Sequence, residues 1–461
     1  MRNILLASAA FIALSTGVAM ADTNDAYILQ IGEANGATQD QSGTSNKASA
    51  FQLGGANISS QTQTGANGNA DVIQLGVSNT ATQTQAGSMN NAVAVQVGKG
   101  NSATQTQMKG SSGNTAASLQ LGENNTVTQT QGAEATGSIT TKTYLFGRVI
   151  GSNTVPTSIA VPSVASAAVA VQAGEYNAAT QSQFGVANLA GSLQVGASNS
   201  VTQTQGTMKP DSSTIFLGAR GTGIEITTAG QIPAPAFASA ALAFQMGEDN
   251  NAGQTQSGTL QNALSVQAGY GNTVTQSQTG HILEGGNSAT AIQLGYQNMA
   301  SQSQTGSGNN GMALQFGWDN TSSQTQSGSS NEASILQAGY DNTATQTQSG
   351  QYNAASAAQF GWSNTATQTQ SGSSGEASIL QAGYDNTATQ TQSGQYNTAS
   401  AAQFGWDNTA TQVQHGASGD AKVLQVGWDN TATQTQKAGG TGNVAKALQF
   451  GGGNTATQTQ K

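Results

Sequence analysis

The chain has 461 residues, enough for two or three globular domains, but its composition does not suit an enzyme-sized core. Charged residues make up 7% of it, against about 25% in a typical soluble domain. The net charge of -9 arises from 12 basic and 21 acidic residues, without a run of Lys or Arg, and there is no Cys. This composition excludes disulfides and thiolate metal sites, and it argues against nucleic-acid binding.

The first 21 residues have the pattern of a secretory signal peptide. Arg2 precedes an apolar stretch from Ile4 to Leu14, and alanines occupy positions 19 and 21. This order predicts a signal peptide over residues 1–21, with cleavage after Ala21. A membrane anchor is the alternative, but it needs about 20 apolar residues. No later stretch is apolar enough to span a bilayer as a helix, so we expect an exported chain with no transmembrane segment after signal removal.

The phrase Gln-x-Gly-x-x-Asn recurs along the rest of the chain. Its dominant spacing is 22 residues, a period typical of solenoids and repeat arrays. Two inserts interrupt it, at about 132–162 and 206–235, and similar residues in both (144–148 and 215–220) predict related hairpins. Residues 22–461 are therefore predicted to form one repeat domain. The seventeen anchoring glutamines are Gln30, Gln52, Gln74, Gln96, Gln120, Gln172, Gln194, Gln245, Gln267, Gln293, Gln315, Gln337, Gln359, Gln381, Gln403, Gln425 and Gln449.

Each repeat divides into two halves of eleven residues, such as those that begin at Asn331 and Asn342. A half has six or seven residues of period-two pattern and a turn with Gly, which predicts one strand and one turn. Gly339 supplies positive φ, and Asp341 and Asn342 tolerate left-handed conformations. We therefore predict an all-β, cross-β (amyloid-like) β-solenoid with two strands per rung. About 17 repeats of 22 residues, stacked about 4.8 Å apart, would form a rod on the order of 80 Å long.

Side chains of one strand alternate between two faces. Gln346 and Gln348 therefore point one way, and Thr343, Thr345 and Thr347 point the other way. Stacking in register would place each Gln above its equivalent in the next rung, where amides can form a ladder that satisfies buried polar groups. In the first strand, large apolar residues such as Leu336 flank Gln337. Either Gln337 faces inward and Leu336 belongs to an outward apolar stripe, or the reverse holds; the sequence leaves both arrangements open.

The pattern Gln-x-Gly-x-x-Asn-x-Ala-x-x-x-Gln, as in Gln337, Gly339, Asn342, Ala344 and Gln348, resembles the repeat of the curli subunits, the bacterial functional amyloids. It recurs over almost all of residues 22–461. The resemblance implies internal ladders of Gln and Asn in a cross-β solenoid. The leading Ser of the family repeat is usually Asn here. The ladder residues so implied include Gln337, Asn342, Gln348, Gln359, Asn364 and Gln370, with their equivalents every 22 positions.

The same resemblance implies a function and partners. It implies a secreted subunit of extracellular fibres at the bacterial cell surface, which acts in biofilm matrix, surface adhesion and cell aggregation. Its partners would be further copies of the chain, a nucleator subunit and outer-membrane export machinery. The segment from residue 22 to the first strand is shorter than the leader of that family. The repeats are more numerous than in its best-known subunits, which predicts either a longer building block or a protein that lays down a whole stretch of fibre.

The sequence shows no polar cap at either end of the repeats, although a solitary solenoid protects its terminal strand edges. The first strand is predicted to start a few residues after Ala21, and only Lys461 follows the strand at 455–460. Low charge, strong β pattern and scarce proline are typical of amyloid-forming segments. We therefore expect head-to-tail growth by templated strand stacking.

Two surface rows support a competing class, a monomeric β-solenoid that binds ice or carbohydrate. The repeated NTATQTQ strands would present a flat Thr array, although Thr is also a favourable outward residue in any strand. One turn position carries an aromatic column, for which mutual stacking is the alternative to sugar binding. The column comprises Tyr270, Tyr296, Trp318, Tyr340, Trp362, Tyr384, Trp406 and Trp428.

No residue set predicts catalysis, a cofactor or a metal, so we do not expect an enzyme. The only histidines, His281 and His415, lie in turn-like positions, and no catalytic set stands outside the repeat. Aspartates recur in the turns, as at Asp341, and could recruit a cation, but they do not match a Ca²⁺ loop. Solvated carboxylates are the simpler interpretation. The inserts are expected either to make lateral contacts or to be tolerated surface loops.

Overall fold

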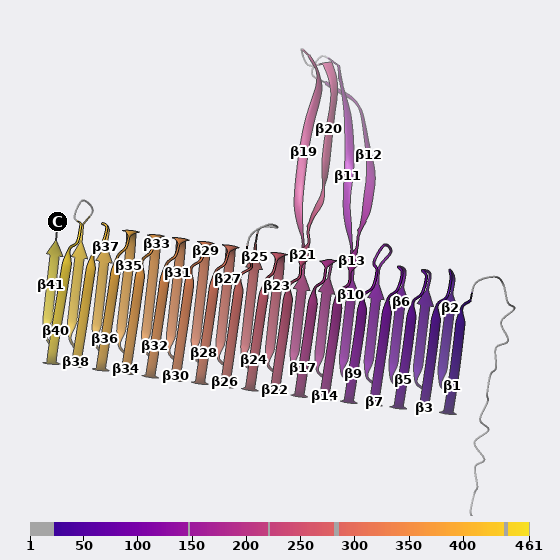
Figure 1. The fold of residues 1–461 in the computed structure, drawn as a ribbon, viewed down its shortest axis with the longest axis horizontal. Coiled ribbons are helices and arrows are strands. Elements are labelled where there is room, and N and C mark those ends of the chain that lie inside the picture. The colour runs from indigo at the N-terminus through magenta and orange to yellow at the C-terminus, as the bar shows by residue number, and fades with distance from the viewer. Residues whose placement is uncertain (1–22, 146–147, 220–221, 281–284, 438–440, 461) are drawn as a thin grey trace, which may run out of the picture. The chain divides into compact units, whose positions relative to one another are not determined.

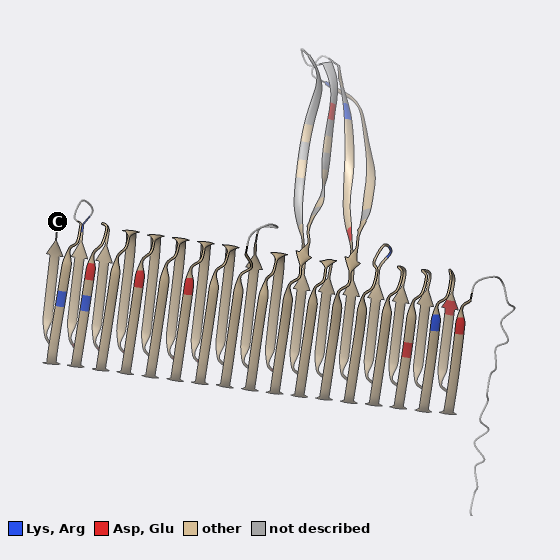
Figure 2. Cartoon of the chain, in the orientation of Figure 1, with Lys and Arg blue, Asp and Glu red and all other residues tan. Residues whose placement is uncertain are grey.

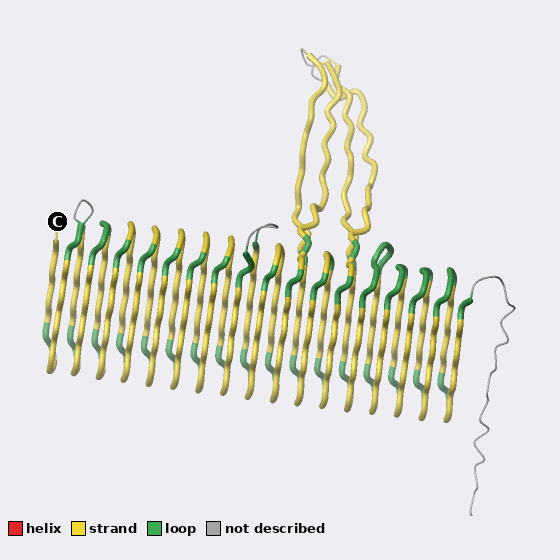
Figure 3. Tube along the Cα trace, in the orientation of Figure 1, coloured by secondary structure: helices red, strands yellow, loops and turns green. Residues whose placement is uncertain are grey.

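The computed structural model describes residues 23–145, 148–219, 222–280, 285–437 and 441–460. The predicted signal peptide, its cleavage site and His281 lie outside these ranges, as do residues 146–147 and 220–221 within the two inserts. The described residues form strands and turns without a helix (Figure 3). They belong to two compact units: Met1–Gly191 with Gln203–Ser239, and Ser192–Thr202 with Ala240–Lys461.

In the first unit, consecutive strands alternate between two parallel sheets (Figure 1). Each residue pairs with its equivalent in the next rung, as Gln30 does with Gln52. One sheet has the order β1 (Asp25–Glu33), β3 (Lys47–Gly55), β5 (Asn69–Val77), β7 (Asn91–Lys99), β9 (Thr115–Glu123) and β14 (Ala167–Glu175). The other has β2 (Gly36–Gln41), β4 (Ile58–Gln63), β6 (Thr80–Gln85), β8 (Ser102–Gln107), β10 (Thr126–Gln131) and β15 (Ala178–Gln183).

The second unit repeats this arrangement with two parallel sheets of its own. The first has the order β22 (Ala240–Glu248), β24 (Asn262–Tyr270), β26 (Ser288–Tyr296), β28 (Asn310–Trp318), β30 (Glu332–Tyr340), β32 (Ala354–Trp362), β34 (Glu376–Tyr384), β36 (Thr398–Trp406), β38 (Asp420–Trp428) and β40 (Val444–Gly452). The second has β23 (Asn251–Thr259), β25 (Thr273–Thr279), β27 (Met299–Ser307), β29 (Thr321–Ser329), β31 (Thr343–Gln351), β33 (Thr365–Ser373), β35 (Thr387–Gln395), β37 (Thr409–Gln414), β39 (Thr431–Gln436) and β41 (Thr455–Gln460). The division between the units falls within β17 (Leu189–Ala197) and β18 (Ser200–Gln205).

Two strands and two turns thus make one rung of about 22 residues, and the prediction of an all-β solenoid is confirmed. The interior of a rung consists of small apolar residues and amides. In β30, Ala333, Ile335 and Gln337 are buried, whereas Leu336 between them is half-buried on the outward side. Of the two arrangements that the sequence left open, the structure has the one with Gln inside and an apolar stripe outside.

The turns explain the spacing of Gly and Asp. Gly339 has a φ of 133°, which L side chains rarely adopt, and a Cβ there would overlap the carbonyl oxygen of Gly361 in the next rung. Asp341, two residues later, has a φ of 57° in the left-handed region, where Asp and Asn are enriched. The residue after it, Asn342, is buried inside the rung. The turn therefore needs Gly for close rung stacking, and Asp341 occupies a left-handed position that other rungs fill with other residues, such as Ser363 with a φ of 54°.

Both inserts are antiparallel hairpins of the first unit. β11 (Ala133–Leu145) pairs with β12 (Arg148–Val161), and β19 (Thr207–Ala219) pairs with β20 (Thr222–Ala234). β11 also pairs with β20, so the hairpins form one four-stranded sheet that extends away from the rungs (Figure 1). At its base lie three short parallel strands, β13 (Ser163–Val164), β16 (Gly185–Val186) and β21 (Ala236–Phe237).

Candidate functional site

The most regular feature of the interior is a ladder of amides from the first strand of each rung. The side chain of Gln337 donates to Oε1 of Gln359 at 2.8 Å, and Gln315 donates in the same way to Gln337 at 2.9 Å. Nε2 of Gln337 also lies 2.9 Å from the carbonyl oxygen of Thr321 and 2.8 Å from that of Asn342. Each buried amide therefore joins its own rung to the next and has its polar atoms satisfied.

The structure places every predicted anchor glutamine in such a ladder. In the first unit the amides of Gln30, Gln52, Gln74, Gln96, Gln120 and Gln172 follow one another. In the second unit the ladder runs from Gln194 through Gln245, Gln267, Gln293, Gln315, Gln337, Gln359, Gln381, Gln403 and Gln425 to Gln449. Gln30 is half-buried, and the others are buried.

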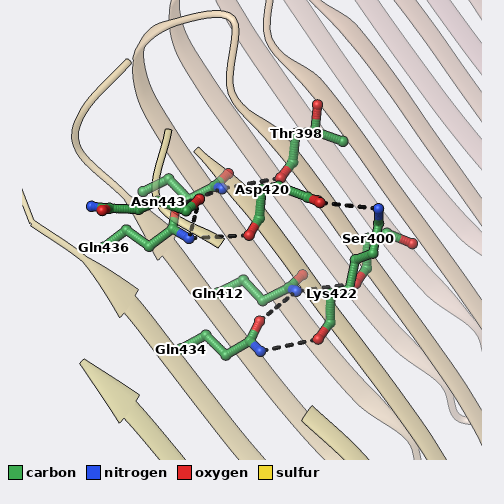
Figure 4. Close-up of polar contacts among 9 residues, drawn as sticks. Thr398, Ser400, Gln412, Asp420, Lys422, Gln434, Gln436 and Asn443 are labelled. Atoms are coloured by element: carbon green, nitrogen blue, oxygen red, sulfur yellow. Dashed lines mark hydrogen bonds and ion pairs between the residues drawn. The ribbon is translucent and has the colours of Figure 1, made fainter. Parts of the chain in front are cut away.

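The second strand of a rung adds two further ladders. Gln346 donates to Gln368 and Gln348 donates to Gln370, each at 2.8 Å. Figure 4 shows the corresponding contacts near the C-terminus, where Gln412 donates to Gln434 at 3.0 Å and Gln434 donates to the carbonyl oxygen of Lys422. The sequence predicted both ladders by placing Gln346 and Gln348 on one face, although only Gln348 and Gln370 were named among the ladder residues that the resemblance implies. The spacing of two in Thr-Gln-Thr-Gln is the signal for both ladders, because it places both glutamines on one face.

The asparagine ladder runs in the opposite direction. Nδ2 of Asn342 donates to Oδ1 of Asn320 at 3.0 Å, and Asn364 donates to Asn342 at 3.0 Å. Nδ2 of Asn342 also lies 2.9 Å from the carbonyl oxygen of Gly361. Glutamine amides thus donate toward the C-terminus and asparagine amides toward the N-terminus. The N-terminal and C-terminal sides of a rung, to which its neighbours stack, therefore present different fixed patterns of donors and acceptors.

The aromatic column lies on the outside of the second unit, at the end of the first strand of each rung. Register pairs its members in the order Tyr270, Tyr296, Trp318, Tyr340, Trp362, Tyr384, Trp406 and Trp428, and all are exposed. Tyr270 and Tyr296 stack with ring centroids 5.0 Å apart, and Trp406 and Trp428 stack at 5.4 Å. Trp318–Tyr340 and Trp362–Tyr384 are edge-to-face pairs. Mutual stacking of these rings is therefore present.

The turn carboxylates beside this column have a conformational role. Asp319, Asp341, Asp385, Asp407 and Asp429 all have φ between 50° and 57°. Among the described residues, no group of three His, Cys, Asp or Glu side chains could hold a metal ion. A preceding carboxylate, Asp249, accepts a hydrogen bond from Tyr270, and this bond raises the pKa of that phenol above its usual value of 10.0. His415, the described histidine, contacts the hydroxyl of Ser393 at 2.8 Å.

The threonines form a second outward face. Thr343, Thr345 and Thr347 are half-buried on β31, and register aligns them with Thr365, Thr367 and Thr369 of β33. Columns of equivalent residues continue along β35, β37, β39 and β41, with Val413 in place of one Thr. Each rung of this region therefore has an apolar and aromatic face on one sheet and a hydroxyl face on the other.

Stacked rungs, internal amide ladders and two different outer faces together define a β-solenoid with a polar, hydrogen-bonded interior. No model of a known protein family matches the chain, and no curated protein matches it either. In the part of the chain that the structure describes, no helix has the length and apolar character to cross a membrane.

Proposed function

We propose that this chain is a secreted structural subunit of curli-like amyloid fibres that grows by stacking of copies, rung on rung. The observation that carries the proposal is the fixed direction of the ladders. Glutamine donors point toward the C-terminus in every ladder, as Gln337 to Gln359 shows. When two copies stack with the same chain direction, the glutamine donors of one copy face the glutamine acceptors of the other. When their directions are opposed, donors face donors. Growth would therefore be head-to-tail.

The outermost described rungs carry the groups that such growth requires. Oε1 of Gln39 is buried and has no hydrogen-bond partner among the described residues. In the last described rung, Gln458 and Gln460 donate to the carbonyl oxygens of Lys446 and Val444. An amide nitrogen has two hydrogens, so each retains one donor for a following rung. Because an unpaired buried polar atom costs about 1–3 kcal/mol, pairing Oε1 of Gln39 would favour addition of a copy, and the donors of Gln458 and Gln460 would supply further hydrogen bonds.

Secretion and the extracellular setting rest on the signal-peptide pattern and on the repeat that resembles curli. In this proposal, the fibre acts at the bacterial surface in biofilm matrix, adhesion and cell aggregation. A nucleator subunit and outer-membrane export machinery are its proposed partners, besides further copies of the chain. The proposal needs no catalytic group or cofactor, because the ladders themselves supply the template.

The test is seeded growth of purified residues 22–461, followed by thioflavin-T fluorescence and electron microscopy. We expect filaments after a lag that preformed seeds abolish. The ladder variant Gln449→Ala, Gln458→Ala, Gln460→Ala should elongate about tenfold more slowly, because the free donors of Gln458 and Gln460 are lost together with the last amide of the first-strand ladder. The matched control changes the exposed Thr455, Thr457 and Thr459 to Ala and should stay within about twofold of the original chain.

Two results would contradict the proposal. Equal elongation of the ladder variant and the Thr control would remove amide templating as the mechanism. A chain that folds promptly and stays monomeric, with or without seeds, would remove the fibre itself. In that case the threonine face and the aromatic column become the surfaces to examine, as sites for ice or carbohydrate.

A further inference from the structure

The outward face of the first-strand sheet in the second unit is apolar along ten consecutive rungs. We call it the pairing face and define it by the residues immediately before and after each buried glutamine. These are Phe244 and Met246, Val266 and Ala268, Ile292 and Leu294, Leu314 and Phe316, Leu336 and Ala338, Ala358 and Phe360, Leu380 and Ala382, Ala402 and Phe404, Leu424 and Val426, and Leu448 and Phe450.

Stacking of rungs leaves this face uncovered. Phe360 is 39% exposed and Phe404 is 36% exposed, although each has a rung on both sides. None of the pairing-face residues is charged. Lys422 and Lys446 lie on the same outward side, two residues before Leu424 and Leu448. Charged positions are few along these strands (Figure 2). Continuous exposed apolar surface of this kind is rare on monomeric proteins and marks a site of association.

Large and small residues alternate across the pairing face in four consecutive rungs. Leu336 precedes and Ala338 follows the glutamine of one rung, whereas Ala358 precedes and Phe360 follows that of the next. The third and fourth rungs repeat this order with Leu380, Ala382, Ala402 and Phe404. Each of these four rungs therefore carries one bulky and one small residue, and their positions exchange from rung to rung.

This pattern is complementary to itself. A two-fold axis parallel to the stacking direction would place each rung opposite the same rung of a second copy, with its strand direction reversed. The residue before the glutamine would then face the residue after the glutamine of the second copy. Leu336 would face Ala338 of that copy, and Phe404 would face its Ala402. Each large side chain would thus meet a small one, as in a steric zipper.

Two features of the surface agree with this arrangement. A hollow of about 340 Å³ lies over Ala402, with Leu424 and Leu448 in its wall, and it is placed to receive a bulky apolar group. Lys422 and Lys446 also border this hollow. With strand direction reversed, Lys422 would lie opposite Trp428 of the second copy, where a cation and an aromatic face attract each other.

We propose that two copies of this chain pair laterally through the pairing face, with a two-fold axis parallel to the direction of stacking. The occupant of the apolar face is thus a second copy, and the size complementarity between Leu or Phe of one and Ala of the other lies in the four rungs from Leu336 to Phe404. This inference goes beyond head-to-tail growth. Stacking uses the backbone and ladder groups of the outermost described rungs and leaves the pairing face free. If stacking also occurs, each filament would contain two chains in cross-section.

The experiment compares filaments of three forms of residues 22–461 by mass per unit length in scanning transmission electron microscopy. The filled variant A358F/A402F replaces the small residues of two rungs. The exchanged variant A358F/F360A/A402F/F404A keeps the original composition but exchanges large and small positions within the same two rungs. Far-UV circular dichroism and seeded elongation rates establish that all three forms fold and stack alike.

We expect two chains per cross-section for the original chain and the exchanged variant, and one for the filled variant, a twofold loss of mass per length. The filled variant is the more apolar surface, so its retention of two or more chains would show unspecific association and overturn the proposal. One chain per cross-section in the original protein would also overturn it and leave the proposed stacking intact. Loss of pairing in the exchanged variant would overturn the two-fold arrangement, because that arrangement alone keeps its large and small positions matched.

If no filaments form, the proposed fibre function fails and lateral pairing is measured separately. Sedimentation velocity of the soluble chain then decides. A dimer that A358F/A402F converts to a monomer supports the proposal, and a monomeric original chain overturns it.

Discussion

The rungs and the hairpin sheet of β11, β12, β19 and β20 are both β-structure, but different interactions stabilise them. The rungs are parallel, and buried amides such as Gln337 connect each rung to the next. The hairpin sheet is antiparallel, and its cross-strand contacts lie at the surface, as between Thr140 and Thr154 at 2.9 Å. A substitution inside a rung therefore removes buried contacts, whereas a substitution in the hairpin sheet removes solvated contacts.

The largest effect is expected at the glycines between rungs. Gly339→Ala places a Cβ against the carbonyl of Gly361 and forces an L residue to a φ of 133°. We expect a loss of about 4 kcal/mol in the free energy of unfolding, measured by denaturant titration. The control Gly253→Ala should change it by less than about 0.5 kcal/mol, because that Cβ meets nothing closer than 3.9 Å. Equal effects of the two substitutions would refute the role of close rung contact.

A smaller effect is expected for the ladder. Gln337→Ala leaves a cavity and removes the partner of both Gln315 and Gln359, for a loss of about 3 kcal/mol. Gln337→Leu fills the space without hydrogen bonds and should recover only part of the loss. Thr347→Ala on the outward side of a neighbouring strand serves as the control. If Gln337→Leu is as stable as the original chain, packing rather than the amide ladder holds the rungs.

The smallest effect is expected in the hairpin sheet. The ammonium of Lys142 on β11 lies 2.9 Å from Glu225 on β20, and the pair is partly exposed. Its hydrogen bond lowers the pKa of Glu225 below 4.5 and raises the pKa of Lys142 above 10.5. Lys142→Gln should therefore accelerate hydrogen exchange only where β11 pairs with β20, residues 137–144 and 223–230, and leave the rungs unchanged.

The direction of these pKa shifts fixes the pH dependence of the contact between the hairpins. The contribution of Glu225 to the stability of this contact is fully present above the usual pKa of 4.5 and is lost as the pH falls through the lowered pKa. The contribution of Lys142 is fully present below 10.5 and is lost as the pH rises through its raised pKa. Exchange at the β11–β20 pairs, corrected for intrinsic rates, should thus be slowest between these limits. A flat profile would show that the ion pair does not hold the hairpins together.

The comparison also shows which features the sequence can predict. The 22-residue period, the two strands per rung and the glycine turns are local and repeated, so they could be read from Gln-x-Gly-x-x-Asn alone. The sequence could not predict on which side Gln337 lies, because both faces of that strand carry apolar residues. A buried Gln becomes favourable only when it pairs with the amides of neighbouring rungs. Pairing of β11 with β20 was also beyond reach, because it joins two inserts about 70 residues apart without a repeated signal.

The ladders and the pairing face differ in their period, but both depend on whole rungs, and this dependence constrains how the gene can change length. Ladders repeat with every rung, but the alternation of large and small residues repeats with every second rung. Residues 332–375 and 376–419 are two nearly identical 44-residue blocks. Duplication or loss of one such block preserves both patterns, whereas a change by 22 residues preserves the ladders and reverses the alternation beyond it. Because the two-fold arrangement sets each rung opposite the same rung of the second copy, large and small residues stay matched after either change. Natural length variants of this protein should therefore differ in steps of whole rungs, 22 or 44 residues, within this region.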